Sequence, residues 1–579
     1  MSSGADPIAA NPSGPTWTSA AADAAAMERH RAAVARIARA VRAHYDRGEP
    51  FRIHHGSSNS TRPPPAGQRA VDISALRHVL AVDARARTAL VEPNVAMDAL
   101  VEATLPHGLV PPVVMEFPGI TAGGGFAGTA GESSSFRHGF FDESVAAVEM
   151  VLADGDVVRA SPAPADHPDL FAAARGAVGS LGVTTLLELR LVPARRFVRT
   201  TYRRTSAVAA AVAAVRDEMA RPANDYVDAI LFSPVHGAVI TGEMADDAPP
   251  AGQAPRTFSR PGDEWFYLHV EAATRALPPG GTVVEYVPLA EYLFRYDRGG
   301  FWVGRWAFAY FFFVPFTRFF RRLLDDFLHT RMMYRSLHAS ANSQTFVVQD
   351  LALPFRSAHA FVYYAAREFD IWPLWLCPLK RPRGPTFHPT TTTVAEELEL
   401  ARSAARDGAS AAAEGPAVAS DTVEGSAPAA PPPPGLAPDP LEETHMLNIG
   451  LWGPGAEAHA RFVAENRALE DQVRFLGGSK WLYAHTYYAE PDFWAQYYRG
   501  PGGGRAAYDA LRRKYRATSL PSVYDKVKVS ERVDGWRDRL KLIWPVGGLW
   551  GLWKGIRSRD YLLHRRATWK YKPGKEKEA

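Results

Sequence analysis

The chain has 579 residues, of which 46% are apolar and 22% charged, and its formal net charge is +4. This composition excludes a long disordered chain, which lacks the apolar side chains needed to offset the entropy lost on folding, and the length predicts two or more domains. The small net charge excludes the strongly basic class of nucleic-acid-binding proteins. The single cysteine, Cys377, excludes an intramolecular disulfide, a Cys/His zinc set and an iron-sulfur cluster, so we expect no metal and a reducing compartment.

The first third of the chain predicts a helix followed by a mixed α+β region. Residues 1–45 begin with Ala, Ser, Gly and Pro without a secretory signal, and residues 22–45 have the spaced apolar side chains of a helix. Short β-like runs separated by Gly and Pro follow at residues 89–92, 148–158 and 184–192. The Asp154-Gly155 pair between two apolar runs predicts a hairpin turn.

Two loops in this region have the composition of a phosphate-binding site. The first, residues 54–62, is rich in Ser, and its small side chains allow consecutive backbone N–H groups to converge on an anion. The second, residues 118–135, contains six glycines, each of which costs backbone entropy on ordering. Close approach to a planar or phosphorylated ligand therefore explains the second loop better than mobility.

Residues 123–128 also match the G-x-G-x-x-G pattern of a Rossmann dinucleotide site. That fingerprint follows a buried parallel strand and opens a helix in a βαβ unit. Here Pro111, Pro112 and Pro118 interrupt the preceding run. We therefore interpret the match as accidental.

The rest of the chain, from about residue 200 to 540, mixes helical and strand-like segments with one interruption. Residues 389–443 lack apolar periodicity and include four consecutive prolines, so we expect a disordered surface insertion. The last 26 residues carry nine Lys or Arg against three Asp or Glu, a net charge of +6. This tail therefore holds more positive charge than the net of the whole chain.

Aromatic residues are abundant, with 29 Phe, 21 Tyr and 14 Trp, and they gather at residues 301–316 and 542–553. The first cluster is followed by Arg318 and two more arginines, and it contains Pro315. Both clusters are shorter than the roughly 20 apolar residues of a membrane-spanning helix. Two interpretations stay open: contact with lipid headgroups, where aromatic rings and cations suit the boundary, or a buried helix that lines a large apolar pocket.

Several segments between residues 50 and 530 follow a recognisable order. They are the Gly/Ser loop at 55–62, Thr-x-Gly-Gly at 121–124, the hairpin at 151–155, and residues 179–183 ahead of Val192-Pro193. This order resembles the vanillyl-alcohol-oxidase type of FAD-binding domain. The match narrows to the Δ24-sterol reductases, or diminuto-like proteins, on the segments 132–135 with Gly139, 151–155, 285–289, 348–350, 375–378, 482–484 and 523–526.

The resemblance implies an α+β fold with a two-subdomain PCMH-type FAD-binding domain and an α+β cap domain for the substrate. The corresponding ranges are residues 1–45 for an Ala-rich, partly helical segment, 46–200 for the FAD-binding domain, 201–540 for the cap with a C-terminal return to the FAD domain, and 541–579 for a Trp-rich basic tail. It also implies NADPH-driven reduction of a carbon–carbon double bond in a sterol side chain, by hydride transfer from flavin N5 and protonation. The chain departs from the family in lacking a counterpart of the animal enzymes' N-terminal membrane helix, and in carrying the insertion and the tail.

The resemblance also places the flavin contacts on the two glycine-rich loops and on one later strand. The expected FAD-binding residues are Gly56, Ser57, Ser58, Asn59, Ser60, Thr61, Arg62, Thr121, Ala122, Gly123, Gly124, Gly125, Phe126, Ala127, Gly128, Thr129, Ala130, Gly131, Glu132, Ser133, Gly182 and Val183. Arg62 and the His54-His55 pair are candidates for the pyrophosphate. Where related bicovalent enzymes have their flavin-linked histidine, this protein has Ser58 and Asn59, so we expect FAD to bind non-covalently.

Reduction of an isolated alkene requires a proton donor held in a dry pocket. A buried carboxylic acid with a raised pKa supplies one, and Asp350 and Glu132 are the candidates. His485, Tyr483 and Tyr487 in the segment Leu-Tyr-Ala-His-Thr-Tyr-Tyr are alternatives. Each also has a purely structural interpretation, as a turn residue or as part of an apolar wall.

Two other functions remain open at this stage. One is an FAD-dependent oxidase of a lipophilic alcohol, and the other is a non-catalytic flavoprotein docked on a membrane. For the reductase we expect a sterol or isoprenoid alkene as substrate and no nucleic acid as partner. We also expect the protein to associate peripherally with a membrane, on the cytosolic side of the endoplasmic reticulum.

Overall fold

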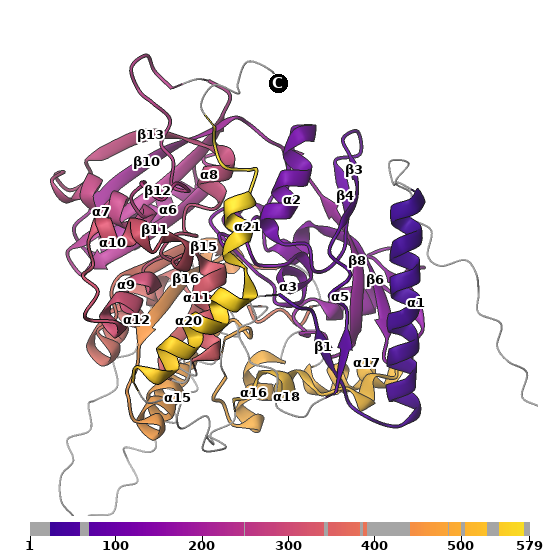
Figure 1. Cartoon of the computed structure of the whole chain (residues 1–579). Coiled ribbons are helices and arrows are strands. Elements are labelled where there is room, and N and C mark those ends of the chain that lie inside the picture. The colour runs from indigo at the N-terminus through magenta and orange to yellow at the C-terminus, as the bar shows by residue number, and fades with distance from the viewer. Residues whose placement is uncertain are drawn as a thin grey trace, which may run out of the picture.

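A computed structural model describes residues 24–57, 69–247, 249–340, 345–382, 386–390, 440–484, 486–498, 504–529 and 544–572. The predicted insertion at 389–443 lies almost wholly outside these ranges, as do residues 58–62 and His485. Figure 1 shows two halves side by side, each built around a β-sheet. The α+β fold class expected from the sequence is confirmed.

The N-terminal half contains a five-stranded antiparallel sheet in the order β3-β4-β8-β6-β7. Its strands are β3 (Val79–Asp83), β4 (Thr88–Val91), β6 (Val145–Leu152), β7 (Val157–Ala160) and β8 (Gly182–Arg190), while β1 (Arg52–His54) and β2 (Ala70–Asp72) form a separate parallel pair. The predicted turn joins β6 to β7, with Gly155 at a φ of +90°. The β-like runs of the sequence are therefore found as strands.

Helix α1 (Ala24–Asp46) is the helix predicted at residues 22–45, and it lies on the outer edge of this half (Figure 1). It buries Val34, Ile37 and Val41 against the sheet because these side chains recur at helical spacing. Other helices of this half are α2 (Met97–Thr104), α3 (Ala122–Ala127), α4 (Ser135–His138) and α5 (Pro168–Ala174).

His30 of α1 lies buried between two carboxylates of the sheet region. Its Nδ1 is 2.9 Å from Glu92 Oε1 and its Nε2 is 3.0 Å from Glu149 Oε1. Burial alone lowers the pKa of His30, but the hydrogen bonds and charges of Glu149 and Glu92 outweigh it and raise the pKa to about 9. His30 is thus a buried cation that anchors α1.

This anchor makes the stability of the N-terminal half depend on pH. Because the folded pKa lies above the unfolded value, the contribution of His30 is fully present below about pH 6.5 and is lost as the pH rises through about 9. We expect the free energy of unfolding of the parent protein, measured in urea, to fall as the pH rises over this range. The fall should exceed that of His30→Gln by on the order of 3 kcal/mol. Parallel pH profiles of the two proteins would contradict the assignment.

The C-terminal half is built on an eight-stranded antiparallel sheet, called the cap sheet below, in the order β13-β10-β12-β11-β15-β16-β14-β17. The strands are β10 (Phe197–Thr205), β11 (Tyr226–Ser233), β12 (His236–Ala245), β13 (Thr282–Pro288), β14 (Phe346–Leu353), β15 (Leu374–Lys380), β16 (His445–Pro454) and β17 (Ser479–Lys480). The ends of β15 and β16 pair as Lys380 with His445, so the insertion leaves one strand and returns on its neighbour.

The two faces of the cap sheet differ because side chains alternate along a strand. Helices α6 (Val208–Met219), α12 (Phe355–Phe369) and α15 (His459–Phe475) cover one face, which buries Leu351, Leu376 and Ile449. The opposite face carries Trp375, Cys377 and other residues, and these join the core of the N-terminal half. This shared core joins the two halves.

The segment after the cap sheet returns to the N-terminal half. Its helices there are α16 (Glu490–Tyr497), α17 (Gly504–Lys514) and α18 (Val523–Val527). Lys526 Nζ donates to Gly179 O at 2.6 Å, and Tyr508 donates to Ser180 Oγ at 2.8 Å. The exact domain boundaries given above stay predictions.

Helices α20 (Val546–Ser558) and α21 (Tyr561–Arg566), drawn in yellow in Figure 1, run across the molecule over α11 (Thr330–Ala339). The remaining helices of the cap half are α7 (Phe266–Arg275), α8 (Leu289–Leu293), α9 (Val303–Tyr310), α10 (Arg318–Leu323) and α14 (Pro440–Thr444). Among the helices in the described part of the chain, none is long and apolar enough to cross a bilayer.

The first aromatic cluster divides between the core and the surface. Phe301, Trp302 and Phe308 are buried, whereas Phe312 is 72% exposed and Phe313 is 61% exposed. The cluster is therefore partly core and partly surface, and its contact with lipid headgroups stays a prediction for the exposed part.

Candidate functional site

The glycine-rich segment forms the short helix α3, which Thr121 caps by accepting a hydrogen bond from Gly124 N at 3.2 Å. Its glycines are required by close contact with the protein itself. A Cβ at Gly123 would come within 2.7 Å of Pro93 Cβ, and one at Gly125 within 2.6 Å of Met115 Cε. The strand before it, β5 (Leu109–Val110), pairs antiparallel with β9 (Val192–Pro193), so the context of a Rossmann motif is absent around this segment.

The segment after α3 supplies donors for a ligand. Thr129 adopts a left-handed φ of +52°, and within the described residues the backbone N–H groups of Thr129 and Gly131 have no hydrogen-bond partner. Unpaired amides of this kind fit the oxygens of a bound dinucleotide. The donor chemistry of the predicted segment 121–133 is thus compatible with FAD.

Hydrogen bonds link the described start of the first glycine-serine loop to the glycine-rich segment. Asn94 Nδ2 donates to Ile73 O at 2.6 Å next to β2, while Gly123 N donates to Pro93 O at 2.7 Å. Residues 93–95 therefore contact the glycine-rich segment directly and reach the start of the first loop through Ile73, whose backbone N donates to His54 O at 2.9 Å. Gly56 has a φ of +73°, Ser57 N donates to His55 Nδ1 at 3.1 Å, and residues 58–62 lie outside the described ranges.

Gly182 and Val183 begin strand β8. A Cβ at Gly182 would lie 2.8 Å from Val151 O, and Val183 is buried in the core of the N-terminal half. The structure accounts for both by packing of the sheet, and their contact with FAD stays a prediction.

Asp350 lies on β14, next to the edge strand β17 of the cap sheet, and faces away from the core that contains Leu351. In register it pairs with Gly450 of β16, which pairs with Trp375 of β15, so these three positions form one row across the sheet. A Cβ at Gly450 would come within 2.6 Å of the Trp452 ring and 3.2 Å of Asp350 Oδ1. The glycine therefore lets the indole lie against the carboxyl group.

The carboxyl group of Asp350 is buried and hydrogen-bonded. Asn448 Nδ2 donates to Asp350 Oδ1 at 2.9 Å, and the hydroxyl of Tyr483 donates to Asp350 Oδ2. Burial raises the pKa of Asp350 to about 7, although hydrogen bonds from Asn448 and Trp452 oppose the increase. The structure thus brings two predicted catalytic residues, Asp350 and Tyr483, into contact.

Trp481 connects this carboxyl group to the glycine-rich segment. Its indole Nε1 donates to Thr129 O at 2.8 Å, and its backbone N donates to Asp350 O at 3.2 Å. A single residue therefore spans from the predicted FAD segment to the predicted acid. The sequence did not single out Trp481, and its place immediately before the Leu482-Tyr483-Ala484 segment is the one signal that could have found it.

Glu132, the second predicted acid, lies in the same region but is held differently. Burial raises the pKa of Glu132, and contacts with Ser134, Ser133 and the charge of Arg295 offset this only in part. Ser133 Oγ donates to Glu132 Oε2 at 2.7 Å, and Ser134 N donates to Oε1 at 2.9 Å. Its oxygens are therefore occupied by the adjacent serines.

Glu116 is a functional candidate that the sequence analysis missed. Its pKa is raised well above the usual value by burial and by the neighbouring charge of Glu132. Among the described residues Glu116 Oε1 has no hydrogen-bond partner. A carboxylate directly after the apolar residues 113–115 could have indicated a buried acid.

Cys377 of β15 lies within the electrostatic reach of these acids. The thiol is fully buried, and its pKa is raised by burial and by the charges of Glu116, Asp228, Glu132 and Asp350. The charges of these four carboxyl groups thus act on one buried position of β15. A protonated, buried thiol is a poor candidate for covalent attachment of a flavin.

An ion pair between Arg295 and Asp228 lies beside these acids. Arg295 Nη2 is 2.9 Å from Asp228 Oδ2, and the two side chains are 1% and 0% exposed. Tyr296 and the indole of Trp375 also donate to Asp228 Oδ2, at 2.8 and 3.0 Å. Arg295 Nη2 donates further to Ser133 Oγ at 3.3 Å, which ties the cap half to the predicted FAD segment.

Aromatic rings form the apolar wall next to Asp350. The Trp452 ring lies 4.5 Å from Phe301, 5.4 Å from Trp302 and 6.0 Å from Trp375, between ring centroids. Tyr334 of α11 packs on Phe117 at 5.9 Å, and the charge of Asp350 acts on its hydroxyl. Most of the buried part of the first aromatic cluster thus contributes to this site.

Tyr487, an alternative acid, is buried in a different part of the cap half from Asp350. It packs on Phe462 of α15 at a centroid distance of 6.2 Å and belongs to the core on the other face of the cap sheet. Tyr487 thus lies on the other face of the cap sheet from Asp350, and its role as a proton donor stays an untested prediction. His485 lies outside the described residues.

Comparison with known proteins identifies one family domain in this chain and several similar enzymes. Residues 29–161 match the family described as FAD binding domain. The chain is 27% identical to the Delta(24)-sterol reductase of Homo sapiens over 462 residues, which cover 78% of this chain and 76% of the human protein. It is 29% identical to the Delta(24)-sterol reductase of Pisum sativum over 337 residues, or 54% of this chain and 56% of the pea protein.

A shorter similarity involves an oxidase. The chain is 30% identical over 138 residues to the decaprenylphosphoryl-beta-D-ribose oxidase of Mycolicibacterium smegmatis, which is 24% of this chain and 30% of that protein. The similarity to the sterol reductases extends over far more of the sequence. Together with the FAD-binding domain, these matches confirm the resemblance seen in the sequence, and the chain is a homologue of the Delta(24)-sterol reductases that carries an FAD-binding domain.

Proposed function

We propose that the protein catalyses NADPH-driven, FAD-dependent reduction of a carbon–carbon double bond in the side chain of a sterol. Its assignment as an FAD-dependent oxidoreductase follows from the FAD-binding domain and the similarity to the sterol reductases. The observation that carries the finer proposal is Asp350, a buried carboxyl group with a pKa of about 7 beside an aromatic wall.

An isolated trisubstituted alkene is not polarised, so a hydride adds to it only when a proton is delivered to the other carbon. Bound FAD would supply the hydride, and the protein has to supply the proton. Asp350 is suited to this task because a donor with a pKa near the working pH combines the correct protonation state with a strong driving force for transfer. Tyr483 contacts the same carboxyl group and can pass a proton to it.

The neighbours of Asp350 orient it and exclude water. Asn448 donates to one carboxyl oxygen, which fixes the rotation of the group. Trp452, Trp375 and Phe301 are all at most 7% exposed and present ring faces and edges rather than polar atoms. Apolar area of this kind suits a rigid sterol, which is bound mainly by removal of its surface from water at about 25 cal/mol per Å².

Non-covalent FAD and NADPH belong to the same proposal. The buried, protonated state of Cys377 argues against a thioether, and the predicted first loop lacks a histidine at the position used in bicovalent relatives. We further propose peripheral contact with a membrane, where sterols reside, with the endoplasmic reticulum as the expected location.

A rival function is oxidation of a lipophilic alcohol by the same flavin domain, which the similarity to the mycobacterial oxidase favours. The two reactions differ in which substrate reduces the flavin. Under anaerobic conditions we expect NADPH to bleach the flavin absorbance rapidly, and a Δ24-unsaturated sterol to restore it. Bleaching by an alcohol substrate but not by NADPH would replace the reductase with the oxidase. Bound flavin that neither substrate affects would instead favour the non-catalytic alternative.

A further inference from the structure

Most of the exposed large apolar side chains in the described part of the chain come from two segments. In the described part of the chain, all the exposed large apolar residues except Val235 and Tyr363 come from two segments, 312–323 and 546–563 with Trp544. They are Phe312, Phe313, Phe319, Leu323, Trp544, Val546, Leu549, Trp550, Trp553, Ile556 and Leu563, called the aromatic face below. Such concentration is unusual for a soluble surface and marks an interaction site.

Helix α20 is oriented opposite to an ordinary surface helix. Its buried positions are Gly547, Gly548, Gly551 and Gly555, whereas Trp550 and Trp553 are 41% and 44% exposed. Glycine in a helix interior costs about 1 kcal/mol relative to alanine, so four glycines on one face need a reason. A Cβ at Gly551 would lie 2.5 Å from Ser336 O, and one at Gly555 would lie 3.1 Å from Met332 Cε.

The glycines thus seat α20 directly on α11 and leave its large side chains pointing outward. The two exposed segments are also joined to each other. Phe312 and Trp544 stack with centroids 5.4 Å apart, and the Trp544 indole donates to Tyr310 O at 2.9 Å. The aromatic face is therefore one surface built from two distant parts of the sequence.

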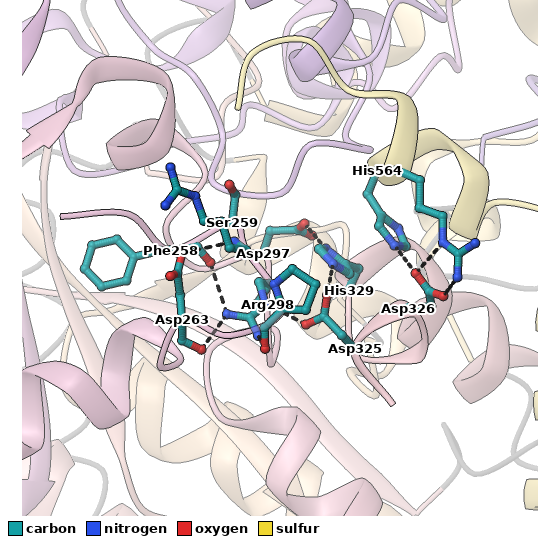
Figure 2. Close-up of polar contacts among 12 residues, drawn as sticks. Phe258, Ser259, Asp263, Asp297, Arg298, Asp325, Asp326, His329 and His564 are labelled. Carbon is teal, nitrogen blue, oxygen red and sulfur yellow. Dashed lines mark hydrogen bonds and ion pairs between the residues drawn. The ribbon is translucent and has the colours of Figure 1, made fainter. Parts of the chain in front are cut away.

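Polar contacts hold the end of this surface in place, as Figure 2 shows. The ring of His564 in α21 stacks on His329 at 3.7 Å and its Nε2 donates to Asp326 at 2.9 Å. His329 lies between Asp297 and Asp325, and Arg298 pairs with Asp325 at 2.7 Å. Burial and the charge of His329 lower the pKa of His564 to about 4, whereas Asp297 and Asp325 raise the pKa of His329 against the effect of burial.

The charge around the aromatic face is positive. Lys554 Nζ lies 5.3 Å from the ring centroid of Trp550 and 5.4 Å from that of Trp553. The guanidinium of Arg557 also lies over the Trp553 ring, 5.4 Å from its centroid. Arg318, Arg322, Arg559 and Arg566 are exposed as well. The acidic residues within or directly after the two segments are Asp325, Asp326 and Asp560, and each is occupied in an ion pair with an arginine. The cations therefore stay available to an external anion.

We propose that the aromatic face docks on an anionic phospholipid bilayer, with its tryptophans in the headgroup boundary and Lys554 and Arg557 against lipid phosphates. Amphipathic surfaces that combine aromatic side chains with cations bind in this manner. A second copy of the protein fits less well because a symmetric contact would place these cations against each other. The proposal gives a location to the membrane contact proposed above, but it does not depend on the reductase activity.

Co-sedimentation with phosphatidylcholine vesicles, with and without phosphatidylserine, tests the proposal on the full-length flavoprotein. We expect binding that requires phosphatidylserine and weakens with salt. The pair Trp550→Ser/Trp553→Ser should weaken it at least tenfold, since each indole loses much of its apolar burial. Lys554→Gln/Arg557→Gln should weaken it about fivefold for each charge. Val235→Ser/Tyr363→Ser, which removes the two exposed apolar residues outside the face, is the matched control and should bind as the parent does.

Equal binding by the tryptophan pair and the parent would overturn the proposal. Size-exclusion chromatography provides a second test. If the parent protein elutes as a dimer and the Trp550→Ser/Trp553→Ser variant as a monomer, the aromatic face is a subunit interface and the proposal is overturned. Flavin retention shows that each variant is folded. NADPH oxidation with detergent-dispersed sterol is measured on the same samples. A tryptophan variant that turns over normally but no longer binds vesicles supports docking. A parent protein that binds vesicles but shows no turnover contradicts only the proposed reaction.

Discussion

Replacing Asp350 with asparagine should lower the rate of alkene reduction by about 10²- to 10⁴-fold, the usual contribution of a positioned proton donor. Asparagine keeps the shape of the side chain and its contact with Asn448, but it has no carboxylic proton to deliver. Reduction of the flavin by NADPH requires no such proton donor and should continue near the parent rate. Stopped-flow measurement of the two half-reactions separates these effects.

The pH profile gives a second readout for the same residue. Because burial raises the pKa of Asp350 to about 7, its acid form is lost as the pH rises through that value, and the alkene half-reaction of the parent protein should slow accordingly. Asp142→Asn is the matched control. Burial also raises the pKa of Asp142 to about 7, but the partner of that carboxyl group is Arg175, whose Nη1 lies 3.7 Å from Asp142 Oδ2. If both substitutions slow the alkene step equally, Asp350 is a structural residue.

Removing the carboxylate of Asp228 should be the most destabilising single substitution in the cap sheet. Asp228→Ala leaves the guanidinium of Arg295 buried without its ionic partner, and breaking a pair of this kind costs about 3–5 kcal/mol. Tyr296 and Trp375 lose an acceptor at the same time. The expected result is a large fall in the urea midpoint, together with weaker flavin retention because Arg295 also holds Ser133.

A double variant distinguishes an unpaired charge from a simple cavity. Asp228→Ala/Arg295→Met removes both charges, so it should be more stable than Asp228→Ala alone despite carrying one more change. If the loss of stability in the double variant equals the sum of the losses in Asp228→Ala and Arg295→Met, the two side chains have no interaction energy with each other. Arg195→Met, which removes an exposed arginine paired with Asp246, is the surface control and should change the urea midpoint little.

Much of the N-terminal half was predictable because its signals are local. The strands at 88–91 and 182–190 follow from apolar runs, and Gly155 alone fixes the turn between β6 and β7. Helix α3 was not predictable, since three consecutive glycines disfavour a helix. Tertiary contacts override that preference: Pro93, Met115 and Phe141 leave no room for side chains there.

The candidate site was predictable only in part, because sequence spacing does not report which strands become neighbours. Asp350 and Tyr483 were both candidates, but their contact depends on the pairing of β14 with β17 across a separation of more than a hundred residues. Glu116 and Arg295 belong to no motif, and their role appears only when both halves meet. Tyr487 lies on the opposite face of the cap sheet, a placement that no local signal in the sequence indicates.

The pairing of Lys380 with His445 has a consequence for how this fold can vary. The two residues close a loop whose ends are already fixed by the ladder between β15 and β16, and loop closure costs only about 0.6 kcal/mol for each doubling of length. Loop length at this point is thus nearly decoupled from stability. The same ladder holds the row of Trp375, Gly450 and Asp350, so an added domain or a reporter could be inserted here while the row keeps its register.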